Sequence, residues 1–357
     1  MTTSVVREQV PLAPYTTLRL GGPAGRLVEA TTEEEVVDAV AAADRSGEPV
    51  LVLGGGSNVV IPDEGFPGTV VRVASCGVDM STAGQRVLVR AQAGEDWEPL
   101  VAHCVDEGLA GIECLSGIPG LVGATPIQNV GAYGQEISDT VATVRVYDRR
   151  TGEIAQLEHE QCGFGYRTSA FKRSGRYVVL GVTLELWPRW QSAPVRYGEL
   201  ARALGVQVGD RVALPDARAA VLSLRRSKGM VLDPADPDAV SAGSFFTNPV
   251  LDDDGLAALR RRIARRVGAD VEPPCYPAGE GSSKVSAAWL IDQAGFPKGY
   301  GRGPVRISTK HTLALTNPSR QASTAELLAL AREIRDGVRD AFGVELRNEP
   351  VLLGVDL

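Results

Sequence analysis

Apolar and polar residues follow one another along the chain in patterns that predict a mixture of helices and strands. Thr32, three glutamates and an apolar repeat predict a helix that ends at Gly47. Apolar residues recur with helical spacing between Trp97 and Val105, and Gly108 follows them. Further helices are predicted over residues 251–267, 286–294 and 324–342, and strands over 49–53, 59–61, 86–91, 141–147, 177–186 and 344–353.

These patterns also predict how the chain is organised. Helix and strand signals alternate in the first third, and a second lobe begins near Cys76. The stretch from Pro188 to about Asp238 is heterogeneous, with scattered Pro and Gly. A more helical unit follows, and 357 residues are more than one hydrophobic core usually holds. The sequence therefore predicts two or three domains.

Composition and charge narrow the classes of function. The 40 glycines and 22 prolines favour turns and sites lined by backbone. A net charge of −7 argues against general nucleic-acid binding, so an anionic ligand needs a local cationic cluster. No long apolar run predicts a membrane span, and the first residues show no apolar signal core. Five cysteines without a CxxC pair argue against a disulfide framework or a zinc site, so we expect a cytoplasmic protein without metal.

Two glycine-rich segments are candidates for ligand loops. Gly54-Gly-Gly-Ser-Asn58 follows a short apolar strand, and its backbone N–H groups could converge on a phosphate. It could equally be a simple turn, and neither a dinucleotide-binding GxGxxG nor a P-loop is present. The second segment, from Ser116 to Gly134, is apolar between its glycines, as if backbone lay against something planar. It could also be a packed loop between lobes.

Five motifs occur together in one order. They are Leu53-Gly-Gly-Gly-Ser-Asn-Val-Val, Ile118-Pro-Gly-Leu-Val-Gly-Ala-Thr-Pro-Ile-Gln-Asn-Val-Gly-Ala-Tyr-Gly, Phe164-Gly-Tyr-Arg-Thr-Ser-Ala-Phe-Lys, Gly243-Ser-Phe-Phe-Thr-Asn-Pro and Asn348-Glu-Pro-Val. In this order they resemble the UDP-N-acetylenolpyruvoylglucosamine reductase family, from about Thr17 to the end of the chain. Arg196-Tyr-Gly-Glu-Leu200 is similar to a tyrosine-bearing loop of the type I branch of that family.

The resemblance implies a fold and a reaction. The fold would be α+β, with a two-lobed FAD-binding module of the vanillyl-alcohol-oxidase/PCMH type and a third, α/β substrate-binding domain. The implied boundaries are 1–75 and 76–225 for the two lobes, 226–340 for the substrate domain, and 341–357 for a strand that returns to the active site. FAD would be bound non-covalently and NADPH would be the co-substrate. The product, UDP-N-acetylmuramate, serves peptidoglycan synthesis, and hence cell shape and division. The partner would be a UDP-sugar, with no nucleic acid and no membrane, and the protein would be a monomer.

Three residues match the catalytic positions of the family. Arg167 would stabilise negative charge on the substrate carboxylate, because a guanidinium is permanently charged and can bind it through two hydrogen bonds. Ser244 would donate a proton to carbon, and Glu349 would act with Arg167. Read without the resemblance, these residues would more simply be a salt-bridge arginine, a serine bonding its own backbone and a structural carboxylate.

The other implied contacts fall on loops. Tyr197, Lys228 and Asn248 match the substrate-binding positions, and Lys284 is an even choice between substrate contact and solvated loop. The arginines at 260–266 are interpreted as a solvated helix face. The implied FAD contacts are Gly54, Gly55, Gly56, Ser57, Asn58, Ser116, Ile118, Pro119, Gly120, Gly123, Ala124, Gln128, Asn129, Gly131, Ala132, Tyr133, Gly134, Arg167 and Val182.

Two other functions use the same residues differently. A flavin oxidase of the same scaffold would often tether FAD through a histidine in the first glycine loop. Here that loop ends in Ser57-Asn58, and the three histidines, His103, His159 and His311, lie elsewhere. A binder of flavin or nucleotide-sugar without catalysis would consume no NADPH with any substrate.

Overall fold

The computed structural model describes residues 5–172 and 174–357, which form two compact units. Unit 1 contains the described residues up to Val10 together with Pro23–Gly56 and Phe66–Ser227. Unit 2 contains Pro11–Gly22, Ser57–Gly65 and Lys228–Leu357. The four residues at the N-terminus, on which the expectation of no signal segment partly rests, lie outside the description. The chain passes into unit 2 for the last time after Ser227, close to the boundary expected at 225, and the finer division into lobes stays a prediction.

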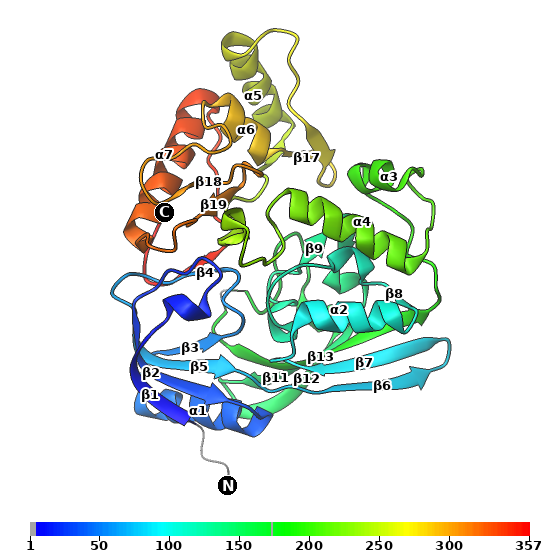
Figure 1. Ribbon diagram of the computed structural model, residues 1–357, viewed down its shortest axis with the longest axis vertical. Helices are drawn as coiled ribbons and strands as arrows, with labels where there is room; N and C mark the ends of the chain where they lie inside the picture. Colours follow the sequence, from blue (N-terminus) through cyan, green and yellow to red (C-terminus); the bar gives the residue numbers. More distant parts are fainter. Residues whose placement is uncertain (1–4, 173) are drawn as a thin grey trace. The chain divides into compact units, whose positions relative to one another are not determined.

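The two larger sheets of unit 1 pack on one hydrophobic core, and β9 and β10 form a separate small sheet. Order in the first is β1-β2-β5-β3, with β2 and β3 both parallel to β5, and α1 contacts three of these strands. The second sheet is antiparallel, in the order β12-β11-β13-β7-β6, and α2 lies over it (Figure 1). The strands are β1 (Val5–Pro11), β2 (Pro23–Ala30), β3 (Val50–Leu53), β5 (Phe66–Val73), β6 (Val78–Ala83), β7 (Arg86–Gln92), β8 (Leu109–Ala110), β9 (Gly131–Ala132), β10 (Gln135–Glu136), β11 (Val141–Asp148), β12 (Glu153–Glu158) and β13 (Tyr177–Pro188).

Helices of unit 1 begin and end where local chemistry favours it. Thr32 accepts a hydrogen bond from the Glu35 N–H at 3.2 Å, and Gly47 ends α1 with a left-handed φ of +68°. Both ends were predicted. The unit contains α1 (Glu33–Ser46), α2 (Trp97–Asp106), α3 (Gly198–Leu204), α4 (Leu214–Ser227) and the 3₁₀ turns η2 (Glu113–Leu115), η3 (Val122–Ala124), η4 (Ile137–Asp139) and η5 (His159–Cys162).

The heterogeneous stretch from Pro188 to about Asp238, in which no helix was predicted, contains α3 and α4. Pro215 lies in the first turn of α4, where a helix tolerates proline because that N–H has no partner within the helix. Leu214, Ala217, Val221 and Leu222 form its buried stripe. Neither helix was predicted, since prolines and glycines are scattered through the stretch.

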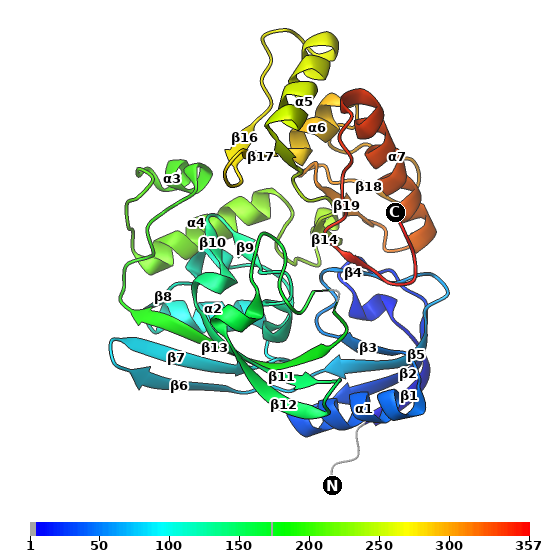
Figure 2. The ribbon, with the colours of Figure 1, turned by 180° about the vertical axis from the view of Figure 1, so that it is seen from behind.

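Unit 2 surrounds its own core, to which α7 contributes a long buried stripe. Figure 2 shows α7 beside β18 and β19. Its sheets have the orders β14-β19-β18 and β15-β17-β16, and β20 pairs in parallel with β4. The elements are η1 (Ala13–Tyr15), β4 (Val59–Val60), η6 (Pro237–Ala239), β14 (Ser241–Ser244), β15 (Val250–Asp252), α5 (Asp253–Arg266), β16 (Cys275–Pro277), β17 (Ser282–Val285), α6 (Ala287–Gln293), β18 (Arg306–Ile307), β19 (Ala314–Thr316), α7 (Thr324–Phe342) and β20 (Val351–Leu352).

Two predicted elements of unit 2 differ from the structure. The helix expected from 251 begins at Asp253, because Val250–Asp252 pairs with β17 and Asp252 caps the helix. The strand expected over 344–353 is reduced to β20. The helix over 324–342 is confirmed at both ends, with a capping box between Ser323 and Glu326. Among the helices that the structure describes, none is both long and apolar enough to cross a membrane.

Candidate active site

In unit 1 the two glycine-rich segments approach each other closely. A Cβ on Gly55 would lie 2.8 Å from Gly120 Cα, closer than real Cβ contacts. A Cβ on Gly123 would lie 2.5 Å from that of Ala93. Gly56 adopts a left-handed φ of +60°, which belongs to the kind of turn whose successive N–H groups can surround an anion. Part of the glycine content is therefore required by backbone packing, and the turn suits a phosphate.

The remaining expected FAD positions of unit 1 lie on the second segment and on β13. Asn129 and Tyr133 have left-handed φ values of +48° and +49°, which are uncommon for residues with a side chain. Ser116 is buried and donates its hydroxyl to the carbonyl of Glu113 at 2.8 Å, so its side chain serves the loop itself. The Val182 side chain is buried in the core, where it leaves only its backbone for a ligand.

Arg167 lies in unit 1 and is held from two sides. Its backbone has a left-handed φ of +51°, and its carbonyl accepts from Lys172 Nζ at 2.7 Å. Its guanidinium donates to the carbonyl oxygens of Gly131 at 2.7 Å and Asn129 at 3.3 Å. Strained backbone that is fixed by several contacts is a feature of functional sites. The guanidinium is thus tied to the second glycine segment, where FAD contacts were predicted.

An aromatic pair borders the same segment. The rings of Tyr133 and Tyr197 meet edge to face with centroids 5.7 Å apart. Burial, opposed by the charge of Arg225, raises the pKa of Tyr133 to about 12, so its phenol stays protonated at neutral pH. Tyr197 is 40% exposed and can meet a ligand.

Unit 2 brings Ser244 and Glu349 together from distant parts of the chain. Ser244 ends β14, and the next residue, Phe245, accepts the N–H of Glu349 at 2.9 Å. The carbonyl of Glu349 in turn receives Asn58 Nδ2 at 3.5 Å, and Val351 N–H donates to the Asn58 carbonyl at 2.9 Å. Asn58, expected as an FAD contact, is therefore fixed to the segment that carries Glu349.

The expected substrate contacts of unit 2 lie in different parts of it: Asn248 just before β15, Lys284 in β17, and Lys228 at the first residue of its last segment. Asn248 Oδ1 accepts the N–H of Ala287 at 2.9 Å, at the start of α6. Lys284 lies in β17, between Val250 and Tyr276 of the flanking strands. Lys228 begins the last segment of unit 2, and Ser57 begins the second.

Several functional candidates escaped the sequence analysis. Lys172 was part of a quoted motif without an assigned role, and Arg225 and Asp238 lay in the heterogeneous stretch from Pro188 to about Asp238. Burial lowers the pKa of Arg225 to about 10, and Asp238 is 2% exposed. Lys172 ends a quoted motif, Asp238 precedes Gly243 by five residues and Arg225 precedes Lys228 by three, and these positions were the only available signal.

Two buried cysteines of unit 1 are held in the neutral form. Burial raises the pKa of Cys104 to about 12 and that of Cys162 to about 11, so both stay protonated at neutral pH. Within 5–172 and 174–357, no three His, Cys, Asp or Glu side chains are grouped so that they could hold a metal ion.

Comparison with known proteins agrees with this arrangement. Residues 24–158 match the model of an FAD binding domain, and residues 234–353 match that of the UDP-N-acetylenolpyruvoylglucosamine reductase C-terminal domain. Two curated relatives, both UDP-N-acetylenolpyruvoylglucosamine reductases, are 60% identical: that of Thermobifida fusca over 100% of both chains, and that of Streptomyces avermitilis over 98% of this chain and 95% of its own. The crystal structure of the UDP-N-acetylenolpyruvylglucosamine reductase from Thermus caldophilus superimposes with a TM-score of 0.66 at 27% identity, covering 98% of each chain.

The FAD-binding domain, with its two close-packed glycine segments and an anchored arginine, defines an FAD-dependent oxidoreductase of the α+β class. FAD is its cofactor, and the Gly54–Gly56 turn and the 116–134 segment fit that group. Because the chain is 60% identical over its full length to a curated member, it belongs to the UDP-N-acetylenolpyruvoylglucosamine reductase family. The expected family, fold class and cofactor are confirmed.

Proposed function

We propose that this protein reduces the enolpyruvyl ether of UDP-N-acetylglucosamine enolpyruvate to the lactyl ether of UDP-N-acetylmuramate, with Arg167, Ser244 and Glu349 as its catalytic residues. NADPH would be the source of electrons, and FAD held by the two glycine segments would supply the hydride that is added to the methylene carbon of the substrate. The observation that carries the assignment of residues is the contact between Phe245 and Glu349, which unites two separate motifs in unit 2.

Arg167 binds the carboxylate of the enolpyruvyl group and stabilises its negative charge. Hydride addition leaves negative charge that is delocalised into this carboxylate, and a cation placed in advance lowers the energy of that state. Two backbone carbonyls and the Lys172 contact fix the arginine before substrate arrives. Holding the charged group in place avoids reorganisation during the reaction.

Ser244 supplies the proton to the carbon next to the carboxylate. A serine hydroxyl is a weak acid, so its proton transfer requires accurate placement and a cation that stabilises the alkoxide. Lys228 is our candidate for that cation. Glu349 is bonded through its N–H to the Phe245 carbonyl, and it acts together with Arg167 on the negatively charged form of the substrate.

The remaining predicted contacts complete the proposal. We assign Tyr197, Lys228 and Asn248 to the UDP-sugar, with Lys284 as a weaker contact. Tyr197 is exposed, and the resemblance of its loop, 196–200, favours the type I branch. The FAD contacts are those of the two glycine segments, together with Ser57, Asn58, Arg167 and the backbone of Val182. We further propose a cytoplasmic monomer with the four-segment division at 75, 225 and 340.

Stopped-flow measurement of flavin absorbance tests the proposal, because it separates the two half-reactions. In Ser244→Ala, reduction by NADPH should stay near the wild-type rate. Re-oxidation by the enolpyruvyl substrate should fall about 10²–10⁴-fold, the usual effect of losing a general acid. Ser244→Cys, which restores an ionisable proton, should recover a substantial part of that loss.

Thr247→Val is the matched control, since it removes a hydroxyl from the same segment that donates only weakly to Arg347 at 3.4 Å. It should re-oxidise normally. If Ser244→Ala re-oxidised as fast as this control, the proton would come from another group and the assignment of Ser244 would be wrong. A flavin that remained attached after acid precipitation would favour a covalent flavin oxidase instead.

A further inference from the structure

The strand that carries Ser244 is irregular just before the serine. β14 pairs with β19 at Ser241–Thr316 and at Ser244–Ala314, with a shift of register between the two pairs. Gly243 inside the shift has a φ of +73°, and its N–H donates to Ser241 Oγ at 3.2 Å. Bulges of this kind re-aim a side chain, and their geometry depends on what holds the flanking residues.

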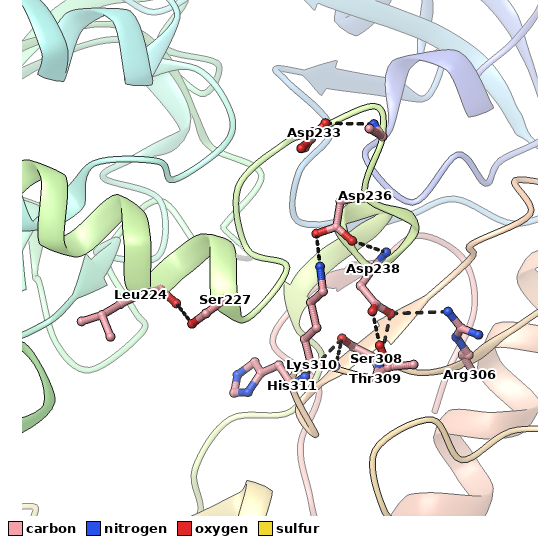
Figure 3. A network of polar contacts seen from close by, with 11 residues as sticks. Leu224, Ser227, Asp233, Asp236, Asp238, Arg306, Ser308, Thr309, Lys310 and His311 are labelled. Carbon is pink, nitrogen blue, oxygen red and sulfur yellow. Dashed lines mark hydrogen bonds and ion pairs between the residues drawn. The ribbon is translucent and has the colours of Figure 1, made fainter. Parts of the chain in front are cut away.

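A buried carboxylate holds the segment that leads into this strand. Asp238 lies in η6, is 2% exposed, and accepts two hydrogen bonds from Thr309 (Figure 3). One is from the Thr309 N–H at 3.1 Å and the other from its hydroxyl. The guanidinium of Arg306 lies 3.7 Å from the same carboxylate and compensates its charge. Removing a carboxylate from water costs free energy, and the two Thr309 hydrogen bonds and the nearby guanidinium offset that cost.

Thr309 belongs to the turn that leads into Ala314, the cross-strand partner of Ser244. This turn, residues 308–313, joins β18 to β19. It is closed by the Ser308 N–H, which donates to Ala314 at 2.8 Å, and Ala314 is the cross-strand partner of Ser244. Leu313 then accepts the N–H of Phe245 at 2.7 Å. The contacts form a ring from Asp238 through β14 to Ser244, across to the turn, and back to Asp238.

We propose that Asp238 is a positioning residue that fixes the hydroxyl of Ser244 for proton transfer. This inference rests on the function proposed above. Asp238 acts at both ends of the ring: it precedes Ser244 on the same chain segment, and it anchors the turn that pairs with Ser244. A carboxylate suits this role because it accepts both Thr309 donors, whereas an amide offers one oxygen and one donor group.

A second acidic contact on the same turn provides a contrast. Asp236 binds Lys310 Nζ at 2.8 Å, and the Lys310 side chain is 38% exposed (Figure 3). Exposed ion pairs contribute little, because solvent screens them. Lys310→Met should therefore have little effect, although it alters the residue next to Thr309.

The test compares Asp238→Asn with Thr309→Val, which removes only the hydroxyl donor, and with Thr309→Ser, which retains it. Asp238→Asn should slow re-oxidation by the enolpyruvyl substrate about 10- to 100-fold, as expected for displacement of a catalytic group by a fraction of an ångström to 1 Å. Thr309→Val should slow the same step by a smaller factor, and Thr309→Ser should restore it. Reduction by NADPH and retention of FAD should stay at the wild-type level in all three variants.

A double-mutant cycle distinguishes positioning of Ser244 from a general structural role. If Asp238 acts through the serine, Asp238→Asn should slow re-oxidation no further when Ser244 is already alanine. Multiplicative effects would overturn the proposal, as would equal losses in both half-reactions. Normal re-oxidation in Asp238→Asn beside a slow Ser244→Ala would overturn only this inference. Normal re-oxidation in Ser244→Ala would instead contradict the proposed function. If Asp238→Asn fails to fold, Thr309→Val and Thr309→Ser in both backgrounds give the same decision.

Discussion

Replacement of Arg225 by methionine should make the protein more stable and less active. Arg225 lies in α4, and its Nε is buried. Burial lowers the pKa of its guanidinium to about 10; Tyr133 and Glu98 oppose the shift, and Arg167 adds to it. A lowered pKa of a cation means that folding disfavours the charged form. The protein therefore carries a cost at every pH below about 10.

The size of this cost follows from the shift. Each pKa unit corresponds to about 1.4 kcal/mol, so the shift corresponds to up to about 3 kcal/mol. The residue as a whole is partly exposed and solvent screens part of the effect, so we expect about 2 kcal/mol. Methionine is unbranched and apolar, fills a similar space and removes the charge. The gain in stability should be accompanied by slower turnover, because a cation close to Arg167 and Tyr133 is lost.

Urea unfolding followed by circular dichroism measures the change in free energy of unfolding. Arg226→Met is the matched control, because Arg226 is the exposed neighbour on the same helix, and its effect should stay within about 0.5 kcal/mol. The difference between Arg225→Met and wild type should be constant below pH 10 and shrink as the pH rises above about 10, where wild-type Arg225 loses its proton. A variant that is less stable than the Arg226→Met control would refute the reasoning, since the guanidinium would then be net stabilising.

Three further changes test the site. Arg167→Lys keeps the charge but loses the planar fork, so re-oxidation by the enolpyruvyl substrate should slow while reduction by NADPH continues, and slowing of flavin reduction alone would assign Arg167 to NADPH. Lys172→Met removes the 2.7 Å contact to the Arg167 carbonyl, and it should lower kcat by about tenfold with flavin content unchanged; loss of bound FAD would point to a structural role instead. Gly55→Ala should weaken FAD retention, because its Cβ would lie 2.8 Å from Gly120 Cα; Gly56 is a poorer test, since its left-handed backbone strains any side chain. Normal FAD affinity in Gly55→Ala, measured by flavin fluorescence, would remove the first glycine segment from the cofactor site.

Local chemistry in the sequence was sufficient for elements whose ends depend on neighbouring residues. The helices α1 and α7 are preceded by Thr32 and Ser323, whose hydroxyls cap N–H groups three residues on, and each is followed by a left-handed glycine. These interactions lie within one or two turns of chain, so the sequence alone is sufficient to predict them. The five motifs, and the family to which they belong, were readable for the same reason, because each motif is a short local string.

Contacts between distant segments required the tertiary structure. The pairing of Phe245 with Glu349, the ring from Asp238 to Ala314, and the tether between Arg167 and Gly131 join residues that no local pattern relates. Asp238 resembles any acidic turn residue in the sequence, and only its burial against Thr309 distinguishes it. The sequence by itself determined the local elements and the family, because caps, glycines and motifs act over a few residues. Which polar groups are buried, and against which partners, was decided by the fold, because burial is a property of packing between segments.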